Sequence, residues 1–131
     1  MYYISDSKEK IQIEDVIRLL RQTYWANSRS RKMIEKSIEN SLCFGVYLEE
    51  NDRQIGFARV ITDYATTYYL CDVIIDENYR GNGIGKSLAA HIVNDSRLRP
   101  LGGFLATRDA HGLYEKFGFS ADSGRYMGKR P

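Results

Sequence analysis

Proline and cysteine are scarce in this sequence of 131 residues. The two prolines, Pro100 and Pro131, leave most of the chain free of residues that interrupt helices and strands. The two cysteines, Cys43 and Cys71, lack the spacing of metal ligands, and no histidine lies near either of them in the sequence. Both lie in apolar stretches, so we expect buried, reduced thiols rather than a metal site or a catalytic cysteine.

Long apolar runs and an excess of one charge sign are also missing. No stretch is long enough to span a membrane, and residues 1–6 lack the basic start and apolar centre of a signal peptide. We therefore expect a cytoplasmic protein with no membrane partner. The formal net charge of +2 falls short of the clustered basic excess of a nucleic-acid-binding domain, so no nucleic-acid partner is expected. The length suits a single domain over residues 1–131.

Two amphipathic helices are predicted near the N-terminus. Apolar residues recur at helical spacing in residues 11–24 and, more weakly, in residues 30–40. The predicted inward stripes are Ile13, Val16, Ile17, Leu20 and Tyr24 in the first helix and Met33, Ile34 and Ile38 in the second.

Strand periodicity follows the second helix. Residues 42–49 alternate in the period of a strand, and residues 54–62 continue as another, with Ile55, Phe57 and Ile61 expected on one face. Residues 68–75 are mostly apolar, as expected of a strand near the centre of a sheet. A short edge strand is predicted at residues 2–4.

The C-terminal third returns to alternating helices and strands. We expect a helix over 83–94, a strand over 104–106, and a helix from an Asp109 N-cap to Phe117, with Gly118 in its C-terminal turn. Residues 119–129 are predicted to add a last strand. The order of elements indicates a mixed α/β layer fold. It is not that of a doubly wound nucleotide fold, because the three middle strands follow one another without crossover helices.

The stretch from Asp76 to Ser87 carries the chemistry, because it joins the central strand to an amphipathic helix through a glycine-rich loop. Glycines leave backbone N–H groups accessible to an anion, and the following helix start adds unpaired N–H donors and a positive dipole end. Arg80 and Lys86 can add positive charge. These features predict a phosphate-binding cradle, although a tight strand-to-helix turn would also use such glycines.

Three phosphate-binding motifs compete for this loop. A Walker A motif needs glycine where Arg80 stands, and a dinucleotide fingerprint needs its third glycine where Lys86 stands. The pattern Arg-x-x-Gly-x-Gly is matched in full by Arg80, Gly83 and Gly85.

This pattern resembles the acetyl-CoA signature of the GNAT superfamily of N-acetyltransferases. The run Leu113-Tyr114-Glu115-Lys116-Phe117-Gly118-Phe119 is similar to the family's C-terminal helix and the glycine after it. The resemblance covers nearly the whole chain and is to small bacterial members. It implies a mostly antiparallel central sheet with helices on both faces, and acetyl-CoA as cosubstrate. The CoA pyrophosphate would be held by Arg80, Gly81, Asn82, Gly83, Ile84, Gly85 and Lys86.

The resemblance also assigns roles around the reacting atoms. The backbone of Val73, Ile74 and Ile75 would pair with the pantetheine arm, and Tyr114 would serve as general acid toward the CoA sulfur. Many members carry asparagine where this chain has Thr107, so that contact departs from the family pattern. The oxyanion would meet a backbone N–H, that of Val73 or Ile74. The base stays open between Asp72, Asp63 and a water chain, since Tyr69 stands where some members have glutamate.

Two functions remain open from the sequence. One is an enzyme that moves the acetyl group to a primary amine of a small molecule or peptide. The other is a CoA-binding regulatory module without transfer, and a homodimer is compatible with either. Trp25 is expected to pack near the acceptor pocket, and His91 to face solvent. His111 is expected to have a structural or cofactor-edge role. The cations Arg21, Arg29, Arg31 and Lys32 could bind an anionic group of the acceptor, but a solvated face is the favoured interpretation.

Overall fold

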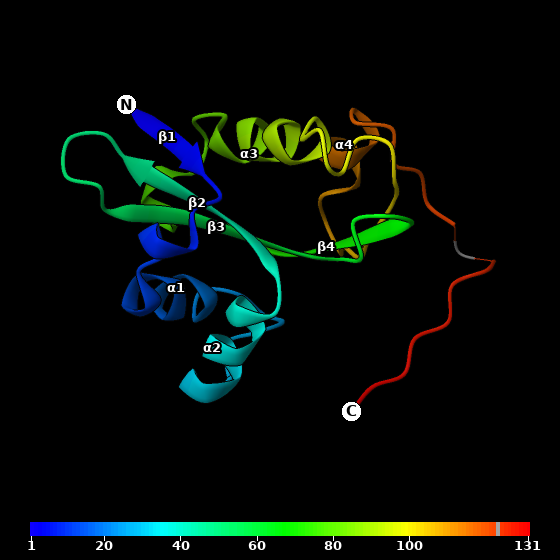
Figure 1. The fold of residues 1–131 in the computed structure, drawn as a ribbon, viewed down its shortest axis with the longest axis horizontal. Coiled ribbons are helices and arrows are strands. Elements are labelled where there is room, and N and C mark those ends of the chain that lie inside the picture. Colours follow the sequence, from blue (N-terminus) through cyan, green and yellow to red (C-terminus); the bar gives the residue numbers. More distant parts are fainter. Residues whose placement is uncertain (123) are drawn as a thin grey trace.

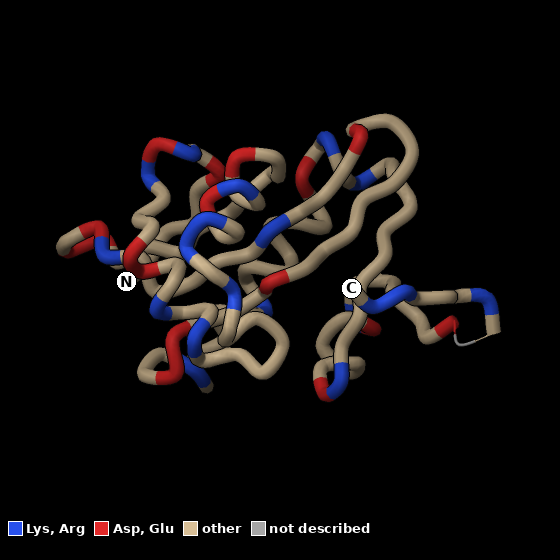
Figure 2. The backbone as a smooth tube through the Cα atoms, turned by 90° about the horizontal axis from the view of Figure 1, so that it is seen from below, with Lys and Arg blue, Asp and Glu red and all other residues tan. Residues whose placement is uncertain are grey.

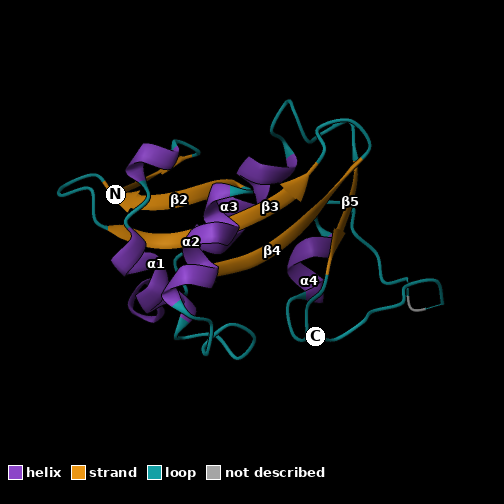
Figure 3. Ribbon diagram, turned by 60° about the horizontal axis from the view of Figure 1, so that its bottom comes forward, coloured by secondary structure: helices purple, strands orange, loops and turns teal. Residues whose placement is uncertain are grey.

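A five-stranded sheet forms the centre of the protein in the computed structural model, which describes residues 1–122 and 124–131. Its strands lie in chain order (Figure 3): β1 (Tyr2–Ser5), β2 (Leu42–Leu48), β3 (Gln54–Thr62), β4 (Thr67–Ile75) and β5 (Gly102–Leu105). The first four are antiparallel, and β5 pairs with β4 in parallel. The predicted mixed, mostly antiparallel sheet is confirmed; β3 has the predicted bounds, and β2 ends one residue earlier than predicted.

Helices cover both faces of the sheet (Figure 1). One face carries α1 (Ile13–Leu20) and α2 (Arg31–Glu39), and the other carries α3 (Ile84–Val93) and the short α4 (His111–Glu115). Two 3-10 turns, η1 (Lys8–Lys10) and η2 (Glu77–Tyr79), complete the elements. Within the described ranges, no helix has the length and apolar character needed to cross a bilayer. Basic and acidic residues are interspersed along the backbone (Figure 2), in keeping with the small net charge.

Each face has its own apolar cluster, and α1 and α2 bury less than predicted. Helix α1 ends at Leu20, so Tyr24 lies beyond it and is 50% exposed, contrary to the predicted stripe. Thr23 explains the ending, because its hydroxyl bonds the Leu20 carbonyl at 2.7 Å and accepts from the Ala26 N–H at 3.1 Å. In α2 the side chain of Ile34 is buried, whereas Met33 is 56% exposed and was wrongly placed inward.

A bulge separates two residues that the sequence placed on one face. Val46 pairs with Gly56 and Tyr47 with Gln54, which leaves Ile55 as an extra residue in β3. Ile55 therefore packs in the cluster beneath α3, while Phe57 packs beneath α1. The third residue of that prediction, Ile61, is 46% exposed near the end of the strand.

The C-terminal helix is shorter than predicted. Its N-cap is Ala110 rather than Asp109, because the Thr107 hydroxyl accepts from the Ala110 N–H at 3.0 Å and closes the preceding turn. Gly118 ends the helix as expected, with a left-handed φ of 92°. Its N–H bonds the Glu115 carbonyl at 3.2 Å, and the next N–H, of Phe119, bonds the Tyr114 carbonyl at 3.3 Å. These two bonds form a Schellman motif.

The predicted strand over 119–129 is wrong for the residues described there, since neither 119–122 nor 124–129 forms one. The chain after α4 instead runs away from the sheet and ends on the side that carries α2 (Figure 1). Sequence periodicity could not decide this, because the segment contains only scattered apolar residues among glycines and charged side chains.

The close packing of Tyr47 over Gly45 gives a test of this fold. The Tyr47 ring is fully buried and stacks on Tyr3 with centroids 5.4 Å apart. A Cβ at position 45 would lie 2.3 Å from the Tyr47 hydroxyl oxygen. We predict that Gly45→Ala lowers the free energy of unfolding by about 1–3 kcal/mol, since the ring has no room to retreat. Urea denaturation measures this loss.

Gly112→Ala is the matched control, because a Cβ there meets no atom within 4 Å and the residue is helical. We expect that variant to be at least as stable as the parent. Equal stability of the two variants would show that Tyr47 does not cover Gly45.

Candidate active site

The site begins where β4 and β5 part. Their register runs only from Thr67↔Gly102 to Leu70↔Leu105, so no described strand pairs with this side of residues 71–75. On the other side the register with β3 shifts between the Phe57↔Ile74 and Arg59↔Cys71 pairs. Asp72 lies in this bulge and has a left-handed φ of 53°, which is uncommon for a residue other than glycine. The result is a bent strand whose edge offers backbone groups to a ligand.

A buried charge cluster holds the bulge. The Asp72 carboxylate accepts from Trp25 Nε1 at 3.1 Å, Arg29 Nη1 at 2.7 Å and Arg59 Nε at 2.9 Å. Arg59 also donates from Nη1 to the Ser41 hydroxyl at 3.1 Å. Burial alone would raise the pKa of Asp72, but the hydrogen bonds from Arg29 and Arg59 outweigh it and hold that pKa below its ordinary value. Arg29 is therefore not on the solvated face predicted for it.

Neither carboxylate considered as a base has the raised pKa that such a role needs. Asp72 is tied to two guanidinium groups. Asp63 accepts from the Thr66 hydroxyl and from the N–H groups of Ala65 and Thr66 in an exposed turn. These hydrogen bonds hold the pKa of Asp63 well below its usual range.

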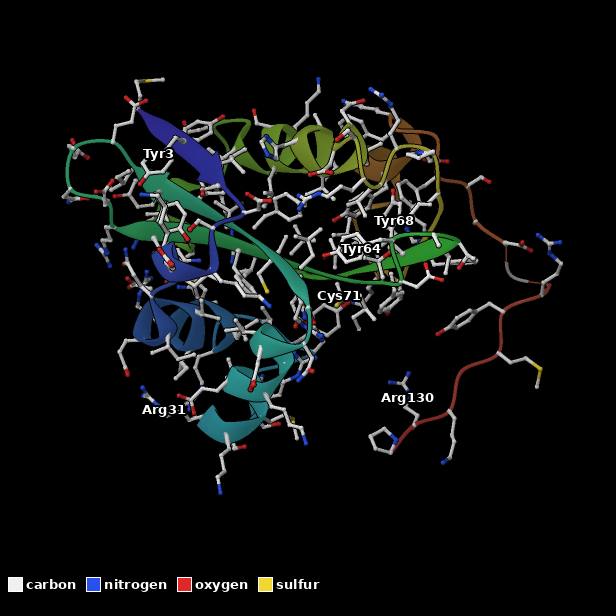
Figure 4. All side chains as sticks on the ribbon, viewed as in Figure 1. Tyr3, Arg31, Tyr64, Tyr68, Cys71 and Arg130 are labelled. Atoms are coloured by element: carbon white, nitrogen blue, oxygen red, sulfur yellow. The ribbon has the colours of Figure 1, made fainter. Side chains whose placement is uncertain are left out.

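A cleft of about 620 Å³, here called the edge pocket, opens along the free edge of β4. Its walls include residues 69–73 of β4 and residues 105–110, which begin at the last residue of β5. The loop between α1 and α2 contributes Tyr24, Trp25 and Arg29. Cys71, labelled in Figure 4, lies on this wall and is only half-buried, whereas Cys43 is fully buried. Both thiols are free, and burial raises each pKa to about 11, which keeps them protonated and unreactive.

A second cleft, the tail pocket, has a volume of about 820 Å³ and lies between β5, α4 and the C-terminal residues. His111, which is exposed, lines this cleft. The two pockets share five lining residues: Tyr69, Leu105, Ala106, Thr107 and Tyr114. Tyr114 and Thr107 therefore stand at the junction of the two clefts.

The phenol of Tyr114 is poised to donate. Its side chain is 7% exposed and packs edge-on against Phe119, with centroids 6.1 Å apart. Among the described residues its hydroxyl has no hydrogen-bond partner, and burial raises its pKa, so it remains protonated at neutral pH. The Thr107 hydroxyl oxygen already accepts from backbone N–H groups, which leaves its own proton for an outside acceptor.

The glycine loop has the geometry of an anion cradle. Gly81 and Gly83 have left-handed φ values of 84° and 76°, and a Cβ on either would meet no atom within 4 Å. Gly83 is the N-cap of α3, and no described hydrogen bond uses the N–H groups of residues 84–86. Asn82 braces the loop by donating to the Tyr79 carbonyl at 3.1 Å. Unpaired donors beside open space suit a bound diphosphate.

Arg80 differs from the prediction that it adds charge to the cradle. Its Nε donates to the Ile75 carbonyl at 3.0 Å and its Nη2 approaches Gln22 Oε1 at 3.5 Å. The arginine thus fixes the end of β4 to the loop, while Lys86 is exposed at the start of α3.

The structure gathers only part of the predicted site in one place. Val73, Thr107 and Tyr114 line the edge pocket, whereas residues 80–86 line neither cleft. The side chains of Ile74 and Ile75 are buried in the two apolar clusters, which leaves only their backbone for a ligand.

Other site residues were not predicted. They are Arg59, which donates to Asp72, and Arg108, which lies beside Tyr24. A charged residue inside the otherwise apolar stretch 55–61 was the available signal for Arg59, because a charge in a buried strand needs a partner. His91 is exposed, as predicted.

Known proteins share this fold. Residues 12–119 match the model of the acetyltransferase (GNAT) family. A crystal structure of a GNAT-family acetyltransferase from Xanthomonas campestris pv. campestris is 36% identical, with a TM-score of 0.92, and the match covers 100% of this chain and 94% of that one. The ribosomal-protein-S18-alanine N-acetyltransferase of Escherichia coli shares the fold at 22% identity and a TM-score of 0.72, over 92% of this chain and 78% of that one.

Curated relatives match over shorter shares of their length. The N-acetyltransferase ycf52 of Gracilaria tenuistipitata var. liui is 27% identical over 86% of this chain and 64% of its own. The histone acetyltransferase TAP1 of Glycine max is 33% identical over 56% of this chain and 32% of its own. The chain thus spans about a third to two thirds of these relatives. The family match over 12–119 and the near-complete structural match show that this chain belongs to the GNAT family of acetyltransferases.

Proposed function

We propose that the protein transfers the acetyl group of acetyl-CoA directly to a primary amine of a small molecule or peptide. The observation that carries the proposal is the Tyr114 phenol, a largely buried residue whose hydroxyl makes no hydrogen bond to the described residues and is open to the junction of the two pockets. A phenol so placed suits a leaving group that becomes negative during the reaction.

The residues present fit acetyl-CoA as cosubstrate, which supplies the activated thioester. The free N–H groups of residues 84–86 and the open space at Gly81 and Gly83 suit its pyrophosphate. The unpaired edge of β4 at Val73, Ile74 and Ile75 suits the amides of its pantetheine arm, which would bind as an added strand. Thr107, with its hydroxyl proton free, would donate to that arm.

Each residue then has one task in the transfer. The amine nitrogen forms a bond to the acetyl carbon, and a backbone N–H of Val73 or Ile74 stabilises the oxyanion. As the carbon–sulfur bond breaks, Tyr114 donates its hydroxyl hydrogen bond to the thiolate. A free thiol has a pKa of about 8.5 and a phenol about 10, and burial raises the pKa of Tyr114 further, so the proton is shared more than transferred. The proton that the amine loses passes to water.

A binding module without transfer is the second candidate. The observation that favours it is that neither of the two carboxylates considered as the base, Asp72 or Asp63, has a raised pKa. Such a module would keep the cradle and the β4 edge and act as a sensor of CoA. The two candidates share the ligand and differ only in whether Tyr114 meets a developing charge.

A valine at position 85 tests the cradle. Gly83 itself is a poor choice, because a valine at a φ of 76° would strain the backbone. Gly85 lies within the first turn of α3, and its Cβ would come no closer than 3.9 Å to Ile75. We predict that Gly85→Val folds and loses at least about 2 kcal/mol of acetyl-CoA binding free energy, because its side chain covers the N–H donors. Calorimetric titration measures the affinity.

The control is His91→Val, a valine at an exposed position on the same helix. It should bind acetyl-CoA like the parent. Unaltered affinity in the folded Gly85→Val variant would show that acetyl-CoA does not bind at this loop.

Cofactor choice gives a second test. ATP can place its phosphates at the helix start, but it has no amide arm to pair with the edge of β4. The loop also lacks the Walker A glycine, and Arg80 is turned toward Ile75 instead of the cradle. We predict that CoA raises the melting temperature more than ATP with magnesium does at equal concentration. A larger shift with ATP would reverse the assignment.

Removal of the Tyr114 hydroxyl distinguishes between the two candidate functions, an acetyltransferase and a binding module. Tyr114→Phe keeps the packing against Phe119 and deletes only the donor. We predict that kcat and kcat/KM fall together by about 10²-fold, the pattern of a contact made only in the transition state, while the affinity for acetyl-CoA is nearly unchanged. Steady-state assay of free thiol release, with an amine that the protein accepts, measures both constants.

Tyr68→Phe is the matched control, since Tyr68 is a buried tyrosine of β4 that lines neither pocket. It should retain full activity. Intact kcat in Tyr114→Phe would mean that Tyr114 is a core residue and that solvent serves the thiolate.

A further inference from the structure

The edge pocket carries a surplus of positive charge. Four arginines line it, against two carboxylates, Asp72 and Asp109. The arginines are Arg29, Arg59, Arg108 and Arg130. The net charge of the whole chain is only +2, so this cleft gathers as much positive charge as the entire molecule carries in excess. An imbalance of this kind selects among ligands by the sign of their charge.

The most buried positive charge of the edge pocket lies in the Asp72 cluster. One carboxylate serves both Arg29 and Arg59, whose side chains are 25% and 12% exposed. The three groups together carry one uncompensated positive charge. Because the cluster is largely withdrawn from water, that charge acts on a ligand more strongly than an exposed lysine would.

Arg108 supplies positive charge at the exposed side of the edge pocket. Its guanidinium lies over the ring of Tyr24, 3.7 Å from the ring centroid, and pairs with no carboxylate among the described residues. Stacking occupies the flat face of the guanidinium and leaves its N–H edges for an acceptor. The contact also joins the segment after β5 to the loop after α1, so the charge is held across the mouth of the cleft.

Cofactor phosphates do not account for these arginines. The loop that suits a diphosphate, residues 80–86, lines neither pocket. The edge pocket instead contains Tyr114 and the free edge at Val73, which are the groups expected around the reacting thioester. A second ligand with a negative group therefore has a place beside the acetyl group.

We propose that the acceptor is an amine that also carries an anionic group, a carboxylate or a phosphate, held by Arg108 and by the cluster of Arg29 and Arg59. This inference rests on the proposed acetyl transfer and specifies its substrate class. Polyamines and other cationic amines are poor acceptors, because their second charge would meet the arginines.

Four amines with the same four-carbon chain test the proposal with the full-length protein and acetyl-CoA. They are 4-aminobutyrate, 4-aminobutyl phosphate, 4-aminobutanamide and 1,4-diaminobutane, compared by kcat/KM at equal free-amine concentration. We expect at least one anionic amine to exceed the amide by about tenfold and the diamine to be poorest. The ranking of the two anions identifies carboxylate or phosphate as the preferred group. The advantage should shrink as salt is raised.

Arg108→Gln provides the matched variant, with Arg99→Gln as its control, because Arg99 is exposed and outside both pockets. We expect Arg108→Gln to lower kcat/KM about tenfold for the preferred anionic amine, with little change for the amide and no change in the KM for acetyl-CoA. Arg99→Gln should behave like the parent.

Three outcomes overturn the proposal. The first is an amide or diamine acetylated as well as both anions. The second is an equal loss for the anionic amine and the amide in Arg108→Gln, and the third is a raised KM for acetyl-CoA in that variant. Acetylation of the amide but not of the anions would refute the proposed specificity and leave the proposed acetyl transfer intact. A protein that binds acetyl-CoA and acetylates none of the four loses the proposed function as well.

Discussion

The buried carboxylate of Asp72 is the interaction on which the site depends. A residue other than glycine at a left-handed φ in the middle of a strand carries a backbone cost, which the surrounding structure must offset. Here the offset is hydrogen bonds from Trp25, Arg29 and Arg59, which come from the α1–α2 loop and from β3. Loss of any one donor would remove a hydrogen bond from the buried carboxylate that stabilises the bulge.

The bulge in turn explains why the sheet opens. Strand β4 pairs with β5 for four residues and then bends at Asp72, so that the two strands no longer share a ladder. Val73, directly after the bulge, lines the edge pocket. The charge cluster thus creates the free edge, supplies one wall of the edge pocket and sets the sign of the charge within it.

Sequence periodicity predicted the positions of β2 and β3, with β3 matching its predicted bounds and β2 ending one residue earlier than predicted. It failed where a single residue changes the parity: the extra residue Ile55 sends its side chain to one face and Phe57 to the other, and no propensity marks such a bulge. Local capping rules failed at Asp109 because a nearby hydroxyl, that of Thr107, closed the turn first. The glycine loop was predictable because positive φ values at Gly81 and Gly83 need glycine.

The contacts between α1 and the segment that leads to the glycine loop affect the entropy of ligand binding. Arg18 of α1 forms an ion pair with Asp76, and Gln22, just after the helix, accepts from the Glu77 N–H at 3.1 Å and is approached by Arg80. A helix on one face of the sheet therefore anchors the segment that leads to a helix on the other. The ordering entropy of this segment is lost during folding, before any ligand arrives. Substitutions in α1 that touch no ligand should consequently appear as an entropic change in affinity, with little change in enthalpy.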